Sequence, residues 1–148
     1  VVLLQAGKSP IIVRKEALGF IANRLQLALF REVAYIIDQG IASAQDVDVA
    51  VKESFGRRLA VKGPVEMAEV QDGYDLIEQV CEYIIPDLCS SRGVPALPLH
   101  QTAIGNLGAK TGKGLYEWPP EAVAQFGREL NRALVEALRR DRERGAGV

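Results

Sequence analysis

The sequence predicts an all-α domain built around one long central helix. Residues 16–39 are apolar in nearly every direction around a helical axis, which is typical of a buried helix. Segments 44–54, 73–89 and 119–144 carry apolar residues at helical spacing. Residues 11–13 are β-branched and predict a short strand. The fold class is therefore a multi-helix domain with a residual N-terminal strand.

The N-terminal part of the chain leads into the central helix. Residues 1–6 are predicted to end a helix, residues 7–10 to form a turn, and residues 11–13 to form the strand. A lone strand needs a partner, so it either pairs with another copy or belongs to a sheet outside this chain. The helix over 16–39 would be ~30 Å long, and Gly40 suits its C-terminal cap. Such a helix must be wrapped by other elements.

Local signals mark the later elements. Ser43 with Asp46 resembles a capping box and predicts a helix over 44–54. Pro64 after a glycine predicts another helix start, and Pro86 is expected to kink or break the helix 73–89. The remaining predictions are a loop at 55–58, a loop at 90–98, a short helix at 99–107, a glycine-rich turn at 105–118 and a final helix at 119–144.

Composition excludes several classes of protein. The chain has 148 residues, 48% hydrophobic and 25% charged, which are values of a single globular domain with a core. Its net charge of −1 gives no general attraction to nucleic acid or an anionic membrane. Cys81 and Cys89 lie eight residues apart, ~12 Å along a helix, which forbids a disulfide there. We expect free thiols in a cytoplasmic protein.

The glycine-rich segment does not predict a nucleotide site. Its glycines at 108 and 112 are one residue too close for a P-loop, and Gly114 stands where a hydroxyl would hold magnesium. No strand-linked G-x-G-x-x-G is present, so a dinucleotide is not expected to bind this chain in the usual way. These glycines are predicted to shape a tight turn that lets Tyr116 and Trp118 fold back onto the helices.

Other candidate residues favour structural roles. His100 is the lone histidine and has no recognisable Ser or Cys nucleophile as a partner. No Cys, His, Asp or Glu cluster has the spacing of metal ligands, so no metal is expected. The acidic residues that follow Gly63 are interpreted as helix-start charges and solvated faces, namely Glu66, Glu69, Asp72 and Asp75.

The polar pair Asn23–Arg24 interrupts the apolar start of the central helix. Burying an amide and a guanidinium without partners is costly, so both must find partners or face a cavity. In the structural interpretation Asn23 caps a neighbouring element and Arg24 pairs with Glu16 or Glu66. In the functional interpretation Asn23 directs a hydrogen-bond donor into a cleft. The pattern alone does not decide between them.

An ordered set of motifs resembles the C-terminal domain of the 3-hydroxyacyl-CoA dehydrogenase family. The resemblance covers roughly residues 8–118. It is carried by Glu16, Gly19, Phe20, Ile21, Asn23, Arg24 and Ala28, then by Gly40–Ile41–Ala42–Ser43 with Asp46 and Asp48, by Gly63–Pro64–Val65–Glu66, and by Lys110–Thr111–Gly112–Lys113–Gly114–Leu115–Tyr116. Leu18 departs from the proline of many relatives. The run from Gly19 to Gln26 with Leu29–Phe30–Arg31–Glu32 is similar to the lambda-crystallin and L-gulonate 3-dehydrogenase branch.

The resemblance implies an enzyme of two domains, of which this chain contains mainly the second. Its members oxidise a 3-hydroxyl with NAD, and their Rossmann domain and catalytic His–Glu dyad precede the strand at 11–13. Residues 1–15 would then be a remnant of the NAD-binding domain, and residues 16–148 the helical substrate and dimerisation domain, of the 6-phosphogluconate dehydrogenase C-terminal type. NAD would be bound mainly by the missing domain, with no cofactor-binding residue here. Asn23 maps onto the family asparagine that hydrogen-bonds substrate in the domain cleft, and is the catalytic and substrate-binding residue carried over.

The resemblance leaves the substrate open. A 3-hydroxyacyl-CoA of fatty-acid metabolism is the first expectation, and a non-CoA 3-hydroxy acid such as L-gulonate is the second. The chain starts in mid-pattern without methionine, so we expect a fragment that is inactive alone. A stand-alone helical oligomerisation module is the rival, and it predicts Asn23 fully buried and bonded to backbone. A related hydroxyacid dehydrogenase group would place a lysine on the central helix, and none lies between Leu18 and Gly40.

Overall fold

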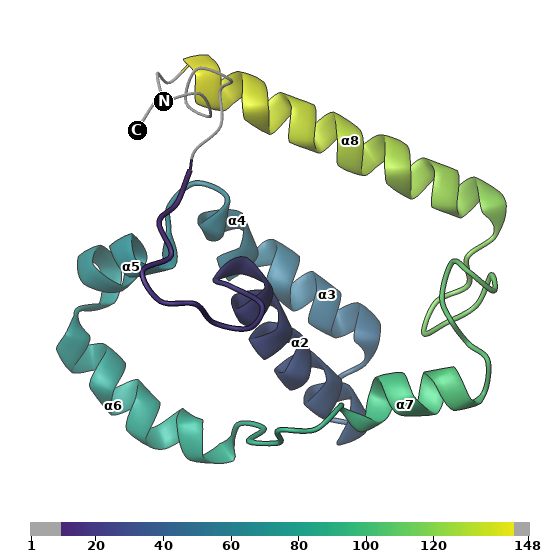
Figure 1. The fold of residues 1–148 in the computed structure, drawn as a ribbon, viewed down its shortest axis with the longest axis horizontal. Helices are drawn as coiled ribbons and strands as arrows, with labels where there is room; N and C mark the ends of the chain where they lie inside the picture. Colours follow the sequence, from purple (N-terminus) through teal and green to yellow (C-terminus); the bar gives the residue numbers. More distant parts are fainter. Residues whose placement is uncertain (1–9, 144–148) are drawn as a thin grey trace. The chain divides into compact units, whose positions relative to one another are not determined.

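The computed structural model describes residues 10–143 and folds mainly into helices (Figure 1). Within this range only isolated bridges, Gly108 with Lys113 and Lys113 with Glu117, have β pairing. The predicted all-α fold class is confirmed. The elements are α2 (Ala22–Asp38), α3 (Ala44–Glu53), α4 (Phe55–Leu59), α5 (Pro64–Met67), the π-helix η1 (Ala68–Asp72), α6 (Tyr74–Ile84), the 3-10 helix η2 (Ile85–Asp87), α7 (Ala96–Ala103) and α8 (Pro120–Glu143).

The chain divides into two compact units. One unit runs from Leu25 to His100 and holds most of α2, the helices α3 to α6, and the beginning of α7. The other contains the residues up to Arg24 and those from Gln101 onward, and therefore the start of α2, the glycine-rich segment and α8. None of the described helices combines the length and apolar character needed to cross a membrane.

The core of the 25–100 unit lies where α2, α3 and α7 contribute small and aliphatic side chains. Ala34, Val47 and Leu97 are its buried residues within the described range. Two carboxylates of α2 fasten the segment that precedes α7. Glu32 Oε2 accepts a hydrogen bond from the Cys89 backbone N at 2.9 Å, and Asp38 Oδ2 accepts one from the Leu97 N at 3.0 Å. Hydrogen bonds to charged groups are among the stronger contacts a fold can make.

The central helix begins at Ala22, six residues later than predicted. Gly19 and Phe20 have φ values of +78° and +49°, which lie outside the helical region. The Phe20 N donates to the Ala17 carbonyl at 3.0 Å, which closes a turn before the helix. The helix ends at Asp38, and Gly40, with φ of +67°, has the predicted C-terminal role.

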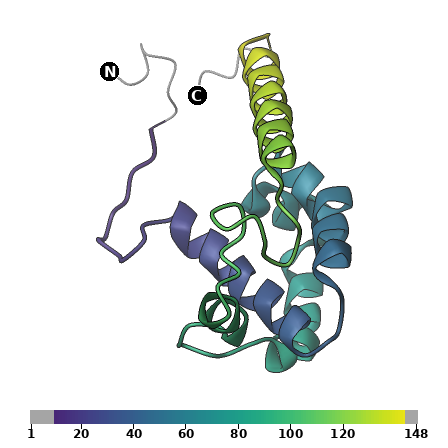
Figure 2. The ribbon, with the colours of Figure 1, turned by 90° about the vertical axis from the view of Figure 1, so that its right-hand side faces the viewer.

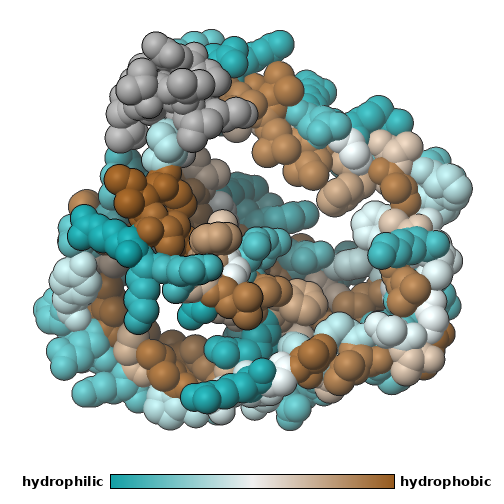
Figure 3. All heavy atoms as spheres, viewed as in Figure 1, coloured by the Kyte–Doolittle hydropathy of each residue, from teal (hydrophilic) through white to brown (hydrophobic). Residues whose placement is uncertain are grey.

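The first half of α2 is exposed, although the sequence predicts a buried helix. Leu25 and Leu27 retain 61% and 64% of their accessible surface, and Ala34 is the buried residue of this helix. Figure 3 shows hydrophobic side chains open on the surface over several helices. The prediction of a helix is confirmed, but the prediction that it is buried all round is wrong for this half of α2 in the described structure.

Several local signals operate as predicted. The Ser43 Oγ accepts a hydrogen bond from the Asp46 N at 3.1 Å, and α3 begins at the next residue after this cap. Pro86 lies in η2, directly after α6 ends at Ile84. The final helix α8 begins at Pro120 and is a continuous rod in both ribbon views (Figures 1 and 2).

The loop predicted at residues 55–58 is wrong, because α4 occupies this position. Glycine at 56 suggests a loop by propensity, yet its actual role is close packing. A Cβ built on Gly56 would lie 2.6 Å from the Val51 carbonyl oxygen. Glycine is required here because the backbone of one helical turn approaches another too closely for a side chain.

Two further predictions need correction. Residues 11–13 form no strand, because no described segment offers them a pairing edge. Helix α7 spans Ala96–Ala103 rather than 99–107. It starts earlier because the Asp38 carboxylate accepts a hydrogen bond from the Leu97 N in its first turn. It ends earlier because Gly105, with φ of +77°, leaves the helical conformation. The predicted helix end at residues 1–6, and most of the turn at 7–10, lie outside the described residues.

We expect Gly56→Ala to destabilise the protein by about 1–3 kcal/mol, because a rigid backbone atom must move to admit the methyl group. Gly127→Ala is the matched control. Gly127 lies inside α8, and a Cβ added to it would meet nothing within 4 Å, so this change should stabilise by roughly 0.5–1 kcal/mol. Denaturant midpoints of both variants check this, and equal midpoints would contradict the packing role.

Candidate functional site

The candidate site is the turn that opens α2. Its backbone adopts two successive left-handed residues, and for Phe20 this conformation is uncommon in a residue with a side chain. Strained backbone of this kind occurs preferentially at active sites and ligand clamps. A Cβ on Gly19 would lie 3.6 Å from the Asn23 Cβ, so the turn packs directly against the residue predicted from the sequence.

Asn23 is the second residue of α2, and its side chain is exposed. Its carboxamide makes no hydrogen bond with any residue in the described range 10–143. The amide therefore offers two N–H donors and one carbonyl acceptor to a ligand. This arrangement contradicts the rival interpretation, which requires Asn23 to be buried and bonded to backbone.

Arg24 supports the turn through a backbone group. Its Nη1 donates to the Leu18 carbonyl at 3.4 Å, across six residues. The structural interpretation, in which Arg24 pairs with Glu16 or Glu66, is therefore wrong. A guanidinium held against the turn carbonyl fixes the segment from which the Asn23 side chain projects.

The local field at the start of α2 favours electron-rich oxygen atoms. The first turn of the helix contains no acidic side chain, so the partial positive charge of its free N–H groups is not neutralised there. An amide donor beside this charge suits a carbonyl oxygen or a hydroxyl oxygen of a ligand. The geometry can therefore hold a substrate oxygen without requiring a group that titrates.

The glycine-rich segment forms the tight turn predicted from the sequence. The Gly108 N donates to the Lys113 carbonyl at 2.8 Å, and the Trp118 N donates to the Gly112 carbonyl at 2.7 Å. Trp118 then meets Phe126 of α8 edge to face, with ring centroids 5.9 Å apart. Such aromatic pairs contribute about 0.5–1.5 kcal/mol beyond their buried area. The segment anchors α8 to its own unit.

The same segment does not fit a dinucleotide. A Cβ on Gly114 would lie 3.1 Å from the Gly108 Cα, so the loop is closed upon itself rather than open around a phosphate. No strand precedes it in the described chain. This segment therefore does not form a dinucleotide cradle.

A groove of about 560 Å³ in the 25–100 unit was missed by sequence reasoning. It combines aliphatic side chains with three cations, and its lining consists of Arg57, Arg58, Val61, Lys62, Glu66, Met67, Val70 and Gln71. Arg57 pairs with Glu53, and Lys62 pairs with Glu66 at 3.2 Å. Arg58 makes no ion pair with the described residues. The signal in the sequence was the cluster of basic residues between the apolar ones at 55–62.

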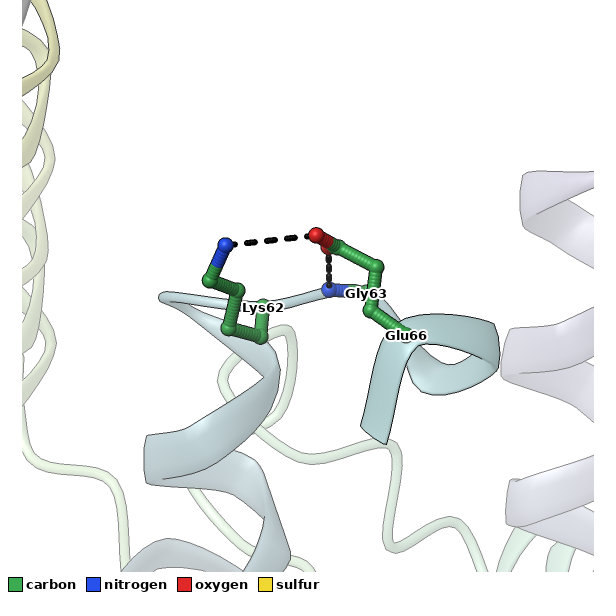
Figure 4. A network of polar contacts seen from close by, with 3 residues as sticks. All are labelled: Lys62, Gly63 and Glu66. Carbon is green, nitrogen blue, oxygen red and sulfur yellow. Dashed lines mark hydrogen bonds and ion pairs between the residues drawn. The ribbon is translucent and has the colours of Figure 1, made fainter. Parts of the chain in front are cut away.

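Glu66 organises one edge of this groove (Figure 4). Its Oε2 accepts a hydrogen bond from the Gly63 backbone N at 3.0 Å, and its Oε1 accepts one from Lys62 Nζ at 3.2 Å. The Gly63 hydrogen bond, followed by the contact with Lys62, lowers the pKa of Glu66 from its ordinary value of 4.5. The prediction that Glu66 is a helix-start charge is confirmed.

The other sequence candidates lie apart from any recognisable catalytic constellation. His100 is exposed on α7, and Glu69 accepts a hydrogen bond from the Tyr74 hydroxyl at 2.9 Å. The described residues contain no group of three or more His, Cys, Asp and Glu side chains that could hold a metal ion. Cys81 and Cys89 are free thiols, as predicted, although they do not share one helix, because α6 ends at Ile84.

The exposed amide at the start of α2 is therefore the candidate ligand-binding group of this helical domain. The known family described as 3-hydroxyacyl-CoA dehydrogenase, C-terminal domain, matches residues 19–118. The chain belongs to this family, which confirms the resemblance drawn from its motifs. The matched range begins at the left-handed glycine and ends at Trp118, so it includes Asn23, the groove and the glycine-rich segment.

The chain is also similar to individual proteins of known name. It is 31% identical over 134 residues to the 5-formyl-3-hydroxy-2-methylpyridine 4-carboxylate 5-dehydrogenase of Mesorhizobium japonicum, covering 90% of this chain and 43% of that protein. It is 42% identical over 60 residues to the human lambda-crystallin homolog, covering 40% of this chain and 19% of that protein. This second match confirms the similarity to the lambda-crystallin branch.

A solved structure shares the fold. The crystal structure of a 5-formyl-3-hydroxy-2-methylpyridine 4-carboxylic acid 5-dehydrogenase, described as an NAD+ dependent dismutase, superposes with a TM-score of 0.85 at 30% identity. The match covers 90% of this chain and 43% of that one. The chain therefore spans less than half the length of the dehydrogenases it matches over most of its own length.

The lowered pKa of Glu66 predicts a pH-dependent contribution to stability. Because the folded-state pKa is depressed, the contribution is present above pH 4.5 and is lost as the pH falls through the folded-state pKa. Glu66→Gln should unfold earlier than the wild type near neutral pH, and the two should converge in acid. Unfolding midpoints across this range check the prediction, with Glu82→Gln on α6 as the control. A constant difference at every pH would contradict it.

Proposed function

We propose that the protein containing this chain is an NAD-dependent dehydrogenase that oxidises a hydroxyl group to a carbonyl, and that this chain is its substrate-side domain. The observation that carries the proposal is the exposed, unpartnered carboxamide of Asn23 at a strained helix start in a domain of a dehydrogenase family. The relatives named above that match most of the chain are dehydrogenases, which supports a dehydrogenation, and the family name supports a hydroxyl group as the group oxidised.

In this reaction Asn23 is proposed to hold the substrate oxygen. An amide N–H donates to the oxygen in both its hydroxyl and carbonyl states, and the hydrogen bond strengthens as negative charge develops. The free N–H groups of the first turn of α2 support the same charge. The turn at Gly19 and Phe20, held by Arg24, fixes the position of the amide. The proton acceptor is proposed to lie outside this chain, in accordance with the family resemblance.

NAD is proposed as the cofactor, bound mainly outside the residues described here. The relative with a solved structure is described as NAD+ dependent, which supports this choice. The closed glycine-rich segment and the absence of a strand in the described range agree with a cofactor site elsewhere in the protein. We also propose that the isolated chain has no dehydrogenase activity.

A hydroxy compound with a free carboxylate is the substrate class we favour. One relative that matches 90% of the chain acts on a compound named as a carboxylate. A 3-hydroxyacyl-CoA is the second candidate, which the family name favours.

The function is tested with Asn23→Ala in the full-length protein. Loss of one donor to a developing oxyanion lowers kcat by about 10²–10³-fold, and we expect this loss with an unchanged unfolding midpoint. Asn131→Ala, on the exposed surface of α8, is the matched control and should retain full activity. Wild-type activity in Asn23→Ala would show that Asn23 does not bind the substrate oxygen.

The substrate class is decided in the same assay by a matched pair. 3-Hydroxybutyrate and its CoA ester share the oxidised carbon and differ in the carboxylate. A higher kcat/KM for the free acid supports the hydroxy-acid proposal. A higher kcat/KM for the CoA ester overturns it and leaves the dehydrogenase proposal standing.

We further propose that the protein is a homodimer and that the exposed face of α2 is part of the interface. Four large apolar residues of this helix remain exposed, namely Leu25, Leu27, Leu29 and Phe30. Leu25 and Leu29 are four residues apart and share one face of the helix. Exposed apolar surface of this kind typically marks an interaction site. Dimerisation through the helical domain is also what the family resemblance implies.

Leu25→Glu in the full-length protein should convert a dimer into a monomer, because a carboxylate cannot be buried in an apolar interface without a partner. Val65→Glu on α5, where the native side chain is also exposed, is the control and should remain dimeric. Sedimentation velocity distinguishes the two. A Leu25→Glu variant that remains a dimer places the interface elsewhere.

A further inference from the structure

A loop fastened at both ends to α2 forms one wall of a pocket to which the proposed function assigns no role. The Glu32 carboxylate holds the loop at Cys89, and the Asp38 carboxylate holds it at Leu97. The pocket lies between this segment and α2, has a volume of about 360 Å³, and is built entirely from the 25–100 unit. Its volume is that of a small-molecule site.

Arg31 brings a guanidinium to the lining of this pocket. The side chain is half-buried on α2 and makes no ion pair with the described residues. Its Nε has no accessible surface and no partner in the described range, so the two outer nitrogens are the donors left for a ligand. A guanidinium edge is shaped to receive a carboxylate through two parallel hydrogen bonds.

Asp38 gives the pocket a second, opposite charge. It lies seven residues after Arg31, which is nearly two helical turns, so both residues project from the same face of α2 about 10 Å apart at the backbone. One Asp38 oxygen, Oδ2, accepts the Leu97 N–H, and a carboxylate has capacity for further hydrogen bonds. A simple anion would be repelled by Asp38, and a simple cation by Arg31.

The rest of the lining suits a ligand with an uncharged middle. Tyr35 and Ser91 carry hydroxyl groups, while Val94 and Ala96 provide aliphatic surface. A linear molecule with a carboxylate at one end, a methylene chain, and an ammonium at the other end would match the guanidinium, the aliphatic wall and the Asp38 carboxylate in that order. Both ends of such a molecule are compensated by charge.

We propose that this pocket binds a small linear zwitterion, with its carboxylate on Arg31 and its ammonium group on Asp38. The site is independent of the proposed dehydrogenase reaction, because it does not use Asn23. A ligand here fixes the loop that precedes α7 against the central helix. The pocket is thus a ligand site formed by side chains of α2, of the fastened loop and of the first turn of α7.

A matched series of ligands tests the proposal in the full-length protein. 5-Aminopentanoate carries both charges, pentanoate carries the carboxylate alone, and pentylamine carries the ammonium alone. Titration followed by the NMR signal of the Arg31 Nε–H should show saturable binding of 5-aminopentanoate. Each singly charged analogue should bind at least about tenfold more weakly, since it leaves one charge of the pocket uncompensated. Equal binding of the three compounds, or no saturable binding, overturns the proposal.

Variants separate this site from general surface binding. Arg31→Met and Asp38→Asn should each weaken 5-aminopentanoate binding by at least about tenfold. Arg92→Met removes an exposed arginine of the same loop that does not line the pocket, and it should bind as the wild type does. Ala96→Phe fills the pocket without touching either charge, so it tests the site even if Arg31→Met fails to fold. Unchanged binding in Ala96→Phe overturns the proposal.

Discussion

Two carboxylates on one helix hold together segments of the 25–100 unit that are far apart in the sequence. Glu32 and Asp38 reach backbone N–H groups at Cys89 and Leu97, across 57 and 59 residues. Their acceptor role fixes both ends of the segment before α7 and brings Leu97 into the core with Ala34. The pocket beside Arg31 exists because this segment is held against α2. Removing either carboxylate would leave a half-buried N–H without its acceptor.

The start of α2 depends on a different constraint, which is backbone conformation. Gly19 and Phe20 turn the chain into the helix through left-handed φ values, and only the first of the two is easily accommodated. Asn23 follows this turn by three residues, at the start of α2. Its amide makes no contribution to folding through a hydrogen bond with the described residues, and in the proposed function it donates to a substrate oxygen.

The sequence reveals features whose physical basis is local. The Ser43 cap, the helix start at Pro64 and the break at Pro86 need only neighbouring residues, and each is found in the structure. The same reasoning failed at Gly56, where glycine serves a close approach to the Val51 carbonyl rather than a loop. It also missed the groove around Arg58, because no local rule shows that α4, α5 and η1 assemble basic and aliphatic side chains into one surface.

The sequence by itself determined the all-α class, the starts of α3, α5, α6 and α8, the family, and Asn23 as the candidate residue. These follow from periodicity, caps and an ordered set of motifs, which are properties of short stretches of chain. Only the tertiary structure decided that Asn23 is open to a ligand, that Arg24 supports the turn, and that half of α2 remains uncovered. Exposure and partnership depend on segments distant in the sequence, because a buried side chain and an exposed one can share the same local pattern.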